Sequence, residues 1–373
     1  MKFINARGES YHPTTFLSFN DVLLRPQKSR FDSRNSPSIN IGGSILDLTE
    51  SDHYSLNLEV PYRIPIISAN MDTVTGPTMA IEMNRLGGIG ILHRFYKDLK
   101  VYAQDIVNVN NALGYVAFSV GIGQKWKDFI NHLYKNHFTQ YNQPSLLVCI
   151  DVAHGHMDGV REMIDHLQNM PSGIHSTIIA GNVATARGAR DLVDAGANII
   201  KAGLGGGSIC STRIVTGHGV PQLSAIMEVK EEIRNEAYII ADGGIKTSGD
   251  IVKALAAGAD CVMIGGILAG HEECPGEVSF GHKVYRGQSS RHFLNDLGKT
   301  DVAAEGEAVK IPFRGKVEMT INELVGGIRS GFTYSGVGSI SELQKNAEFI
   351  EITNHGWVES MPHAIHSGYE QVH

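Results

Sequence analysis

Eight short apolar runs recur along the chain from about residue 60, and most are followed by a helical pattern. This alternation limits the fold more than any other feature. The runs are continuous and rich in Val and Ile, which is typical of parallel strands buried on both faces. Helical patterns at 186–196 and 248–259 carry a glycine at or near the end, a common helix stop signal. The predicted strands span 64–72, 88–93, 116–123, 146–155, 176–183, 198–203, 238–244 and 261–266.

Eight βα units of this size favour a (β/α)₈ TIM barrel, with an open doubly wound sheet as the alternative. We expect a single barrel domain over residues 1–373, with the first sixty residues covering the bottom of the barrel. After the eighth strand, residues 271–316 are polar and dotted with glycine, and they are predicted to form a flap over the barrel. Helical pattern returns at 317–331, and the tail is expected to be irregular from Asn354.

Composition excludes several classes of partner. The 373 residues carry a net charge of -7 and no basic tract, so we expect no nucleic-acid partner. No apolar run approaches the roughly 18 residues that a membrane span needs, so we expect no membrane contact. The chain has only 4 cysteines and no CxxC pair, which predicts a reduced, cytoplasmic protein in which a thiol can stay reactive.

The ends of the last two predicted strands carry the glycine pairs Gly243-Gly244 and Gly265-Gly266. Barrel active sites lie at the C-terminal ends of the strands, and phosphate commonly binds near strands seven and eight. Backbone N–H groups there, and the helix after "TSGD", can hold a phosphate dianion. One pair alone would fit a simple chain turn. Two pairs on neighbouring strands, beside a third glycine-rich loop, indicate a phosphate site.

That third loop, residues 203–207, leads to Cys210. A phosphate cradle needs no thiol, and a cysteine at the mouth of a barrel can reach a bound ring. Nearby N–H groups or Arg213 would favour the nucleophilic thiolate. Burial as a small packing residue is the commoner role of cysteine, and we assign it to Cys149 and Cys261, which lie in apolar runs. Cys210 stands among Gly, Ser and Thr residues and is predicted to be a nucleophile.

Several long motifs resemble the IMP dehydrogenase and GMP reductase family. The likeness runs from about residue 16 to 355. It is carried by "SFNDVLLRP", "SANMDTVT", "AGNVATARGARDLVDAGANIIKAGLGGGSICSTRIVTGHGVPQLSAI", "ADGGIKTSGDIVKALAAGADCVMIGGILAG" and "ELVGGIRSGFTYSG". The resemblance implies a (β/α)₈ barrel, usually a homotetramer, that binds a purine nucleotide monophosphate (GMP or IMP) and a nicotinamide cofactor.

The resemblance also implies residue roles. Cys210 would attack C2 of the purine, and Thr212 and Glu305 would handle protons. The substrate-binding residues would be Ser68, Met71, Ser208, Asp242, Gly243, Gly244, Gly265, Gly266, Tyr285, Gly287 and Ser289. The cofactor-binding residues would be Asp151, Arg94 and Gly203. The backbone carbonyls of Gly205, Gly207 and Cys210 would bind a monovalent cation, K⁺, which not every member of the family uses.

The choice between the two branches depends on the flap. Only 12 residues, 291–302, separate "GQSS" from "AAEG", and they lack the Arg-Tyr pair with which dehydrogenases activate water. This favours a GMP reductase that converts GMP to IMP and ammonia with NADPH or NAD(H). Ala303 and Ala304 stand where reductases usually offer Arg and Ser to a phosphorylated cofactor, so the choice between NADPH and NADH stays open. The alternatives are an IMP dehydrogenase, suggested by "GNVATARGARDL" and "LVGGIRSG", and a non-catalytic nucleotide sensor.

Overall fold

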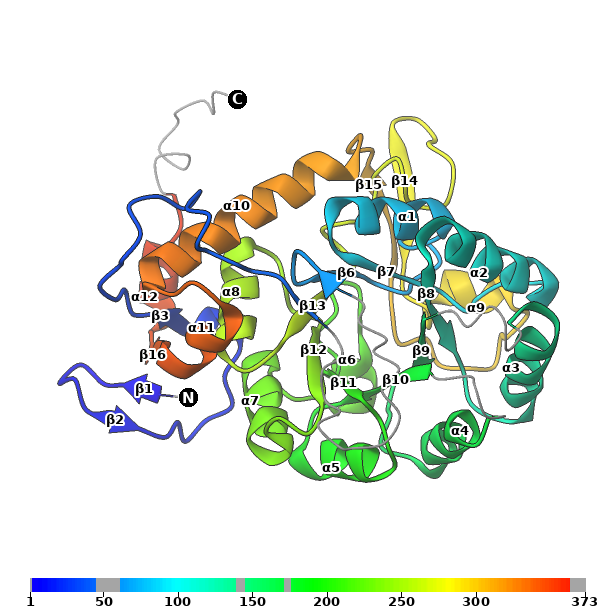
Figure 1. Cartoon of the computed structure of the whole chain (residues 1–373), viewed down its shortest axis with the longest axis horizontal. Coiled ribbons are helices and arrows are strands. Elements are labelled where there is room, and N and C mark those ends of the chain that lie inside the picture. The colour runs from blue at the N-terminus through cyan, green and yellow to red at the C-terminus, as the bar shows by residue number, and fades with distance from the viewer. Residues whose placement is uncertain (1, 45–60, 139–144, 171–175, 363–373) are drawn as a thin grey trace.

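The computed structural model describes residues 2–44, 61–138, 145–170 and 176–362. At its centre, eight parallel strands close into a barrel in the order of the sequence (Figure 1). This confirms the (β/α)₈ prediction and excludes the open sheet. The barrel strands are β6 (Ile66–Ser68), β7 (Ile89–Leu92), β8 (Tyr115–Val120), β9 (Ser145–Asp151), β10 (Ser176–Val183), β11 (Ile199–Ala202), β12 (Tyr238–Asp242) and β13 (Cys261–Ile264).

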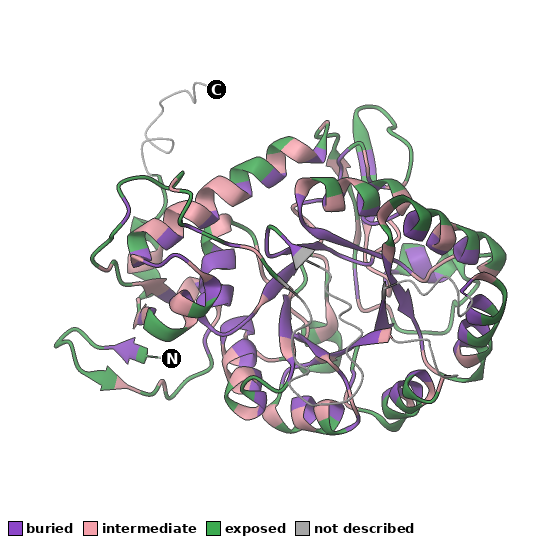
Figure 2. Cartoon of the chain, viewed as in Figure 1, coloured by how far each residue is buried: buried purple, intermediate pink, exposed green. Residues whose placement is uncertain are grey.

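Burial explains why these runs form strands. Figure 2 shows the barrel strands buried and the outward faces of the surrounding helices exposed. Ile66, Leu92 and Phe118 are completely buried, because their side chains pack either inside the barrel or beneath the helices. Burial of each such side chain stabilises the fold by about 1.5–3 kcal/mol. Every predicted strand overlaps one observed strand, although β8 and β9 begin one residue earlier than predicted and most strands end before the predicted end.

Helices surround the barrel and begin at capping residues. Thr185 and Thr247 accept hydrogen bonds from the N–H groups three residues later, which starts α5 and α8. Gly196 and Gly258 follow the ends of the same helices with φ of 101° and 111°, as the glycine signals predicted. The helices are α1 (Pro77–Leu86), α2 (Leu99–Leu113), α3 (Gln124–His137), α4 (Asp158–Gln168), α5 (Ala186–Asp194), α6 (Thr212–Thr216), α7 (Gln222–Ile233), α8 (Ser248–Ala256), α9 (Arg291–Asp296), α10 (Val317–Ser335), α11 (Ile340–Asn346) and α12 (Asn354–Glu359).

The N-terminal segment differs from the prediction that it covers the bottom of the barrel. Leu17 donates its N–H to Ser224 at the start of α7, and Phe19 accepts a hydrogen bond from Lys253 of α8. The start of α7 lies at the C-terminal side of the barrel strands, and the Phe19 ring approaches Gly244 just beyond β12, so the prediction was wrong for residues 17–19. The reason is burial, because Leu17 and Phe19 are almost fully covered between these helices. Residues 45–60 of the same prediction lie outside the described residues.

The remainder of that segment forms small sheets. Strands β1 (Lys2–Ile4), β2 (Ser10–Tyr11) and β3 (Val22–Leu24) join β16 (Glu348–Glu351) in a four-stranded sheet beside the barrel (Figure 1). A 3₁₀ turn, η1 (Phe19–Asp21), precedes β3. Strand β4 (Gly43–Ser44) lies at the bottom of the barrel, where it pairs with β5 (Pro61–Tyr62) just before β6.

The predicted flap at 271–316 contains regular structure. Strands β14 (His282–Arg286) and β15 (Ala308–Pro312) pair as an antiparallel ribbon, and α9 lies between them in sequence. Helix α10 confirms and extends the helical pattern predicted at 317–331. The tail is not irregular from Asn354, since α12 begins there behind the cap of Thr353. Among the described residues, no helix is long and apolar enough to cross a membrane.

Candidate active site

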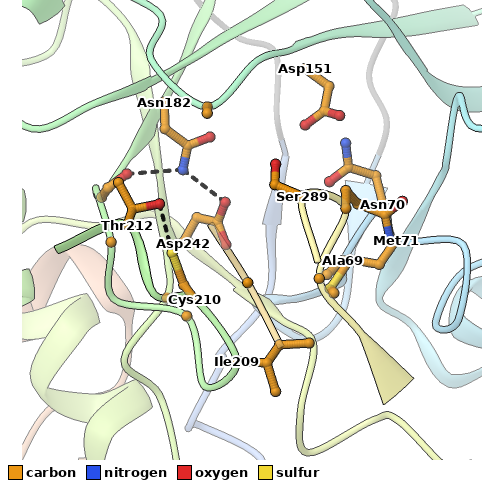
Figure 3. Close-up of a pocket in the computed structure, with 18 of the residues that line it drawn as sticks. Ala69, Asn70, Met71, Asp151, Asn182, Ile209, Cys210, Thr212, Asp242 and Ser289 are labelled. Carbon is orange, nitrogen blue, oxygen red and sulfur yellow. Dashed lines mark hydrogen bonds between the residues drawn. The ribbon is translucent and has the colours of Figure 1, made fainter. Parts of the chain in front are cut away.

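A cavity of about 290 Å³ opens at the C-terminal ends of the barrel strands (Figure 3). Its walls come from strand ends, from the glycine-rich loop 203–212 and from the flap. The loop follows β11, and the flap follows β13 and folds back over the mouth. Barrel enzymes place their reacting groups at this end of the strands.

Three side chains on one wall form a hydrogen-bonded chain. The Cys210 thiol donates to the Thr212 hydroxyl (Sγ–Oγ1 3.2 Å), which donates to the Glu305 carboxylate (Oγ1–Oε2 3.0 Å). Cys210 is an exposed free cysteine that lines the cavity (Figure 3). A thiol, a hydroxyl and a carboxylate in series can move a proton between the sulfur and the carboxylate. The predicted catalytic residues therefore lie together.

Backbone pairing between the loop and the flap holds this chain in place. The Glu307 N–H donates to Ile209 O (2.8 Å), and the Ser211 N–H donates to Glu305 O (3.2 Å). The Glu305 N–H in turn donates to Ser289 O (3.0 Å). Main-chain hydrogen bonds thus join two flap segments to the cysteine loop. They hold Glu305 next to Thr212, although the two residues are 93 positions apart in the sequence.

The other three cysteines cannot supply a reactive thiolate near neutral pH. Burial raises the pKa of Cys149 to about 12 and that of Cys274 to about 11, and it also raises the pKa of Cys261. The packing role predicted for Cys149 and Cys261 fits their complete burial. Arg213, expected near the Cys210 thiol, instead donates to the carbonyls of Leu204 and Val220 and braces the loop.

A second, smaller cavity of about 90 Å³ adjoins the first. Its walls contain both predicted glycine pairs, together with Ser208, Tyr285 and Met71. The Ser208 and Tyr285 hydroxyls lie 3.1 Å apart, and a Cβ at Gly266 would stand 2.8 Å from Ser208 Oγ. Glycine is therefore needed for this close approach. Backbone N–H groups and two hydroxyls in so small a space suit a phosphate group.

The floor of the larger cavity is charged. Lys201 of β11 lies between two carboxylates, 3.2 Å from Asp242 Oδ2 and 3.5 Å from Asp151 Oδ1. Asn182 donates to Asp242 (2.9 Å), and Arg94 Nε donates to Asp151 at 3.3 Å. Burial by itself lowers the pKa of Lys201, but the facing carboxylates outweigh burial and raise it, so this ammonium stays charged.

An ion pair anchors the flap to the barrel. Arg286, at the end of β14, donates twice to Asp72 Oδ2 (3.0 and 2.6 Å), just beyond β6. Arg286 also reaches Asp296 of α9, and Gln288 donates to the other oxygen of Asp72. The nearby His93 is buried, which lowers its pKa to about 4, so its imidazole is neutral near pH 7.

Most of the residues expected at the site line one of the two cavities. In the larger cavity these are Met71, Arg94, Asp151, Gly203, Gly205, Gly207, Cys210, Thr212, Asp242, Gly243, Tyr285, Gly287, Ser289 and Glu305. In the smaller cavity they include Ser208, Gly244, Gly265 and Gly266. Ser68 lines neither cavity, because it is fully buried and its hydroxyl accepts a hydrogen bond from Thr75.

Sequence reasoning missed Lys201 and the anchor of the flap. A lysine inside an otherwise apolar buried strand is a recognisable signal, since a buried ammonium requires partners. The Arg286–Asp72 pair has no comparable signal, because the two residues are 214 positions apart.

The expected cation site remains a prediction. Within the described residues, no group of three or more His, Cys, Asp or Glu side chains could hold a metal. The expected K⁺ ligands are backbone carbonyls instead. The carbonyl of Gly207 already accepts the Cys210 N–H (3.1 Å), which leaves one lone pair for a cation.

Fold and site together define a (β/α)₈ barrel with an exposed cysteine at its mouth and a covering flap, a class whose chemistry occurs at the strand ends. Residues 16–363 match the family described as IMP dehydrogenase / GMP reductase domain, and the chain belongs to this family.

Relatives come from both branches. The chain is 38% identical over 349 residues to GMP reductase 1 of Homo sapiens, covering 90% of this chain and 95% of the relative. It is 35% identical over 346 residues to GMP reductase of Buchnera aphidicola, covering 90% and 94%. It is 48% identical over 234 residues to inosine-5'-monophosphate dehydrogenase of Halalkalibacterium halodurans, covering 59% of this chain and 47% of the relative. The matched region is therefore about half the length of that dehydrogenase.

Proposed function

We propose that this protein is a GMP reductase, which converts GMP, a reduced nicotinamide cofactor and two protons into IMP, ammonium and the oxidised cofactor. The observation that carries the proposal is the hydrogen-bonded chain of Cys210, Thr212 and Glu305 beside a phosphate-sized cradle. Relatives named GMP reductase match over 90% of the chain, which supports the same assignment.

In the first half-reaction, the Cys210 sulfur adds to C2 of the purine. The thiol proton passes through Thr212 toward Glu305, along contacts of 3.2 and 3.0 Å. The same pair then protonates the departing 2-amino group, the C2–N bond breaks, and a covalent thioimidate remains on Cys210. General acid assistance of this kind is typically worth about 10²–10⁴-fold in rate.

In the second half-reaction, the thioimidate is reduced and released. The bound nicotinamide cofactor supplies a hydride to C2. The C2–S bond then breaks, which restores Cys210 and leaves IMP. The residues present fit a dinucleotide ribose, because the Asp151 carboxylate lies across the cavity from Cys210 (Figure 3) and accepts a hydrogen bond from Arg94.

The flap favours reduction over hydrolysis of the thioimidate. Hydrolysis to XMP needs a group that activates water, and Arg291 is the arginine in the short flap segment 291–302. Its guanidinium donates to the carbonyls of Thr300 and Val302, both at 3.0 Å, and so stabilises the turn of the flap itself. This engagement supports the reductase assignment.

IMP dehydrogenase is the second candidate. It would use the same Cys210 intermediate in the other direction and hydrolyse it to XMP. The 48% identity to the dehydrogenase of Halalkalibacterium halodurans favours it over the matched 234 residues. The two functions share the Cys210 intermediate but differ in the direction of hydride transfer and in which small molecule leaves or attacks at C2, so activity decides between them.

The cofactor, cation and assembly belong to the same proposal. We infer that the protein uses NADPH in preference to NADH. The preference should be weak, because Ala303 and Ala304 replace the Arg and Ser that reductases usually offer to a phosphorylated cofactor. A potassium requirement and a homotetramer follow from the family resemblance, a cytoplasmic location follows from the low number of cysteines, and all three stay predictions.

One experiment tests the assignment. Purified protein is incubated with GMP and NADPH, and separately with IMP and NAD⁺. We expect cofactor oxidation with stoichiometric ammonia in the first mixture and little or no XMP in the second. Steady XMP formation faster than GMP reduction would replace the reductase by the dehydrogenase. Tight nucleotide binding without turnover in either mixture would indicate a sensor.

A further inference from the structure

Lys201 is a buried cation at the floor of the cavity, and only 3% of it is exposed. Its ion-pair partners are Asp242 and Asp151, which come from two different strands. A buried ammonium is costly unless carboxylates compensate it. Conversely, two carboxylates that face one small cavity would repel each other without the ammonium between them.

The backbone makes room for this lysine. Along the barrel, Asp151 of β9 stands in register with Gly181 of β10, which stands in register with Lys201 of β11. A Cβ at Gly181 would lie 2.8 Å from the Cβ of Lys201 and 2.5 Å from its carbonyl oxygen. Any other residue at 181 would crowd the lysine, so the absence of a side chain there lets Lys201 stay next to Asp151.

The remaining contacts leave the carboxylates open to ligands. Lys201 and Asn182 both contact Oδ2 of Asp242, and within the described residues Oδ1 of Asp242 has no hydrogen-bond partner. Asp151 is contacted by Lys201 at Oδ1 and by Arg94 at Oδ2. Both side chains line the cavity, and ionised carboxylates are strong acceptors for the paired hydroxyls of a ribose.

We propose that Lys201 is the positioning residue for both ribose-binding carboxylates, and that it couples the purine nucleotide site to the cofactor site. This inference rests on the proposed function and on the roles that the family resemblance implies, with Asp242 at the substrate and Asp151 at the ribose of the cofactor. Lys201 touches neither nucleotide. It acts by keeping both carboxylates charged and oriented, so that its loss weakens both ligands together.

Charge predicts a pH signature for this role. The groups that face the cluster are Lys201, Arg94, the two carboxylates and three groups that are neutral near pH 7, namely His93, the thiol of Cys149 and the hydroxyl of Tyr285. Removal of the ammonium leaves Arg94 as the remaining cation, so the two carboxylates face one cavity with less positive charge between them and their ionised forms are less stable. A protonated carboxylic acid is a poorer acceptor, so ligand binding weakens as the pH falls.

The test compares Lys201→Met and Lys201→Gln with Lys253→Met. Lys253 is also buried, but it donates to Phe19 O and does not line the active cavity. Binding of IMP, and of NADPH in the presence of IMP, is measured by calorimetry from about pH 5.5 to 8.5. IMP is the product of the proposed reduction, so IMP and NADPH do not react during the measurement. The binding result can therefore be interpreted even if the reductase assay fails.

We expect both Lys201 variants to weaken both ligands by about tenfold at pH 6 and by about threefold or less at pH 8.5. The Lys253 variant should match the wild type. A loss that does not vary with pH, or a loss confined to one ligand, would overturn the proposal. If neither Lys201 variant folds, the wild type decides. After correction for protonation of the free ligands, whose phosphate groups titrate at about pH 6, its binding should not change over the same range, and a remaining titration would refute the role.

Discussion

Glu305→Gln is the sharpest test of the proton relay. The amide has the shape of the carboxylate, and its oxygen can still accept the Thr212 hydroxyl at the 3.0 Å contact. Main-chain hydrogen bonds from Glu305 to Ser289 and from Ser211 to Glu305 hold this part of the flap, and they do not depend on the side chain. The substitution therefore leaves the flap in place and removes only the group that takes and returns the proton.

The size of the effect follows from that role. Loss of a positioned general acid or base costs about 10²–10⁴-fold, or about 3–5 kcal/mol of barrier. The loss should fall on ammonia departure, the step in which Thr212 and Glu305 protonate the leaving group. Hydride transfer moves no proton at this position, so its rate should change by about twofold or less.

The two half-reactions are measured separately. Mixing enzyme with GMP alone and quenching in acid follows the thioimidate and the released ammonia. Adding NADPH to the preformed thioimidate in a stopped-flow instrument follows hydride transfer. Glu307→Gln is the matched control, because it removes an exposed carboxylate two positions along the same flap segment. Equal losses in the two half-reactions, or the same loss in the control, would remove Glu305 from the relay.

Three further outcomes are expected. Cys210→Ala should abolish turnover and change the IMP dissociation constant by about threefold or less, as calorimetry would show, because the phosphate cradle lies elsewhere. Asp72→Asn should lower kcat by about tenfold and speed proteolysis of the flap, whereas Asp296→Asn, which leaves the flap tied to the barrel, should do neither. Burial lowers the pKa of His93 from 6.5 to about 4, so the unfolded chain binds this proton more readily than the folded protein does. The free energy of unfolding should therefore fall by up to about 3 kcal/mol as the pH falls from about 6.5 to 4. Urea titrations of His93→Gln should not show this decrease.

The barrel could be predicted because each unit carries its own signal. Continuous apolar runs define the strands, and glycines such as Gly196 and Gly258 mark helix ends within a few residues. The link between Cys210 and Thr212 is similarly local, since two positions separate them. Local signals of this kind need no knowledge of the rest of the chain.

The parts that could not be predicted depend on long-range pairing. Glu305 reaches Thr212 through backbone hydrogen bonds between flap and loop, and only the family resemblance placed it at the site. Leu17 and Phe19 carry no sign of which helices will cover them, so their position was predicted wrongly. Lys201 was visible as a lysine in an apolar strand, but its partners come from strands that only the closed barrel brings near.

The division of the site between barrel and flap explains why one scaffold can support two reactions. The barrel and its loop contribute Cys210, the phosphate cradle and the two carboxylates, which in the proposed reaction bind the nucleotide and bring the sulfur to C2. The flap contributes Glu305 and decides what else can reach C2. A change in flap length or sequence can therefore exchange ammonia departure for water attack while every barrel contact is kept. Sequence identity in the barrel alone therefore cannot separate a reductase from a dehydrogenase. The flap is more informative, because Arg291 already donates to flap carbonyls and is not free to activate water.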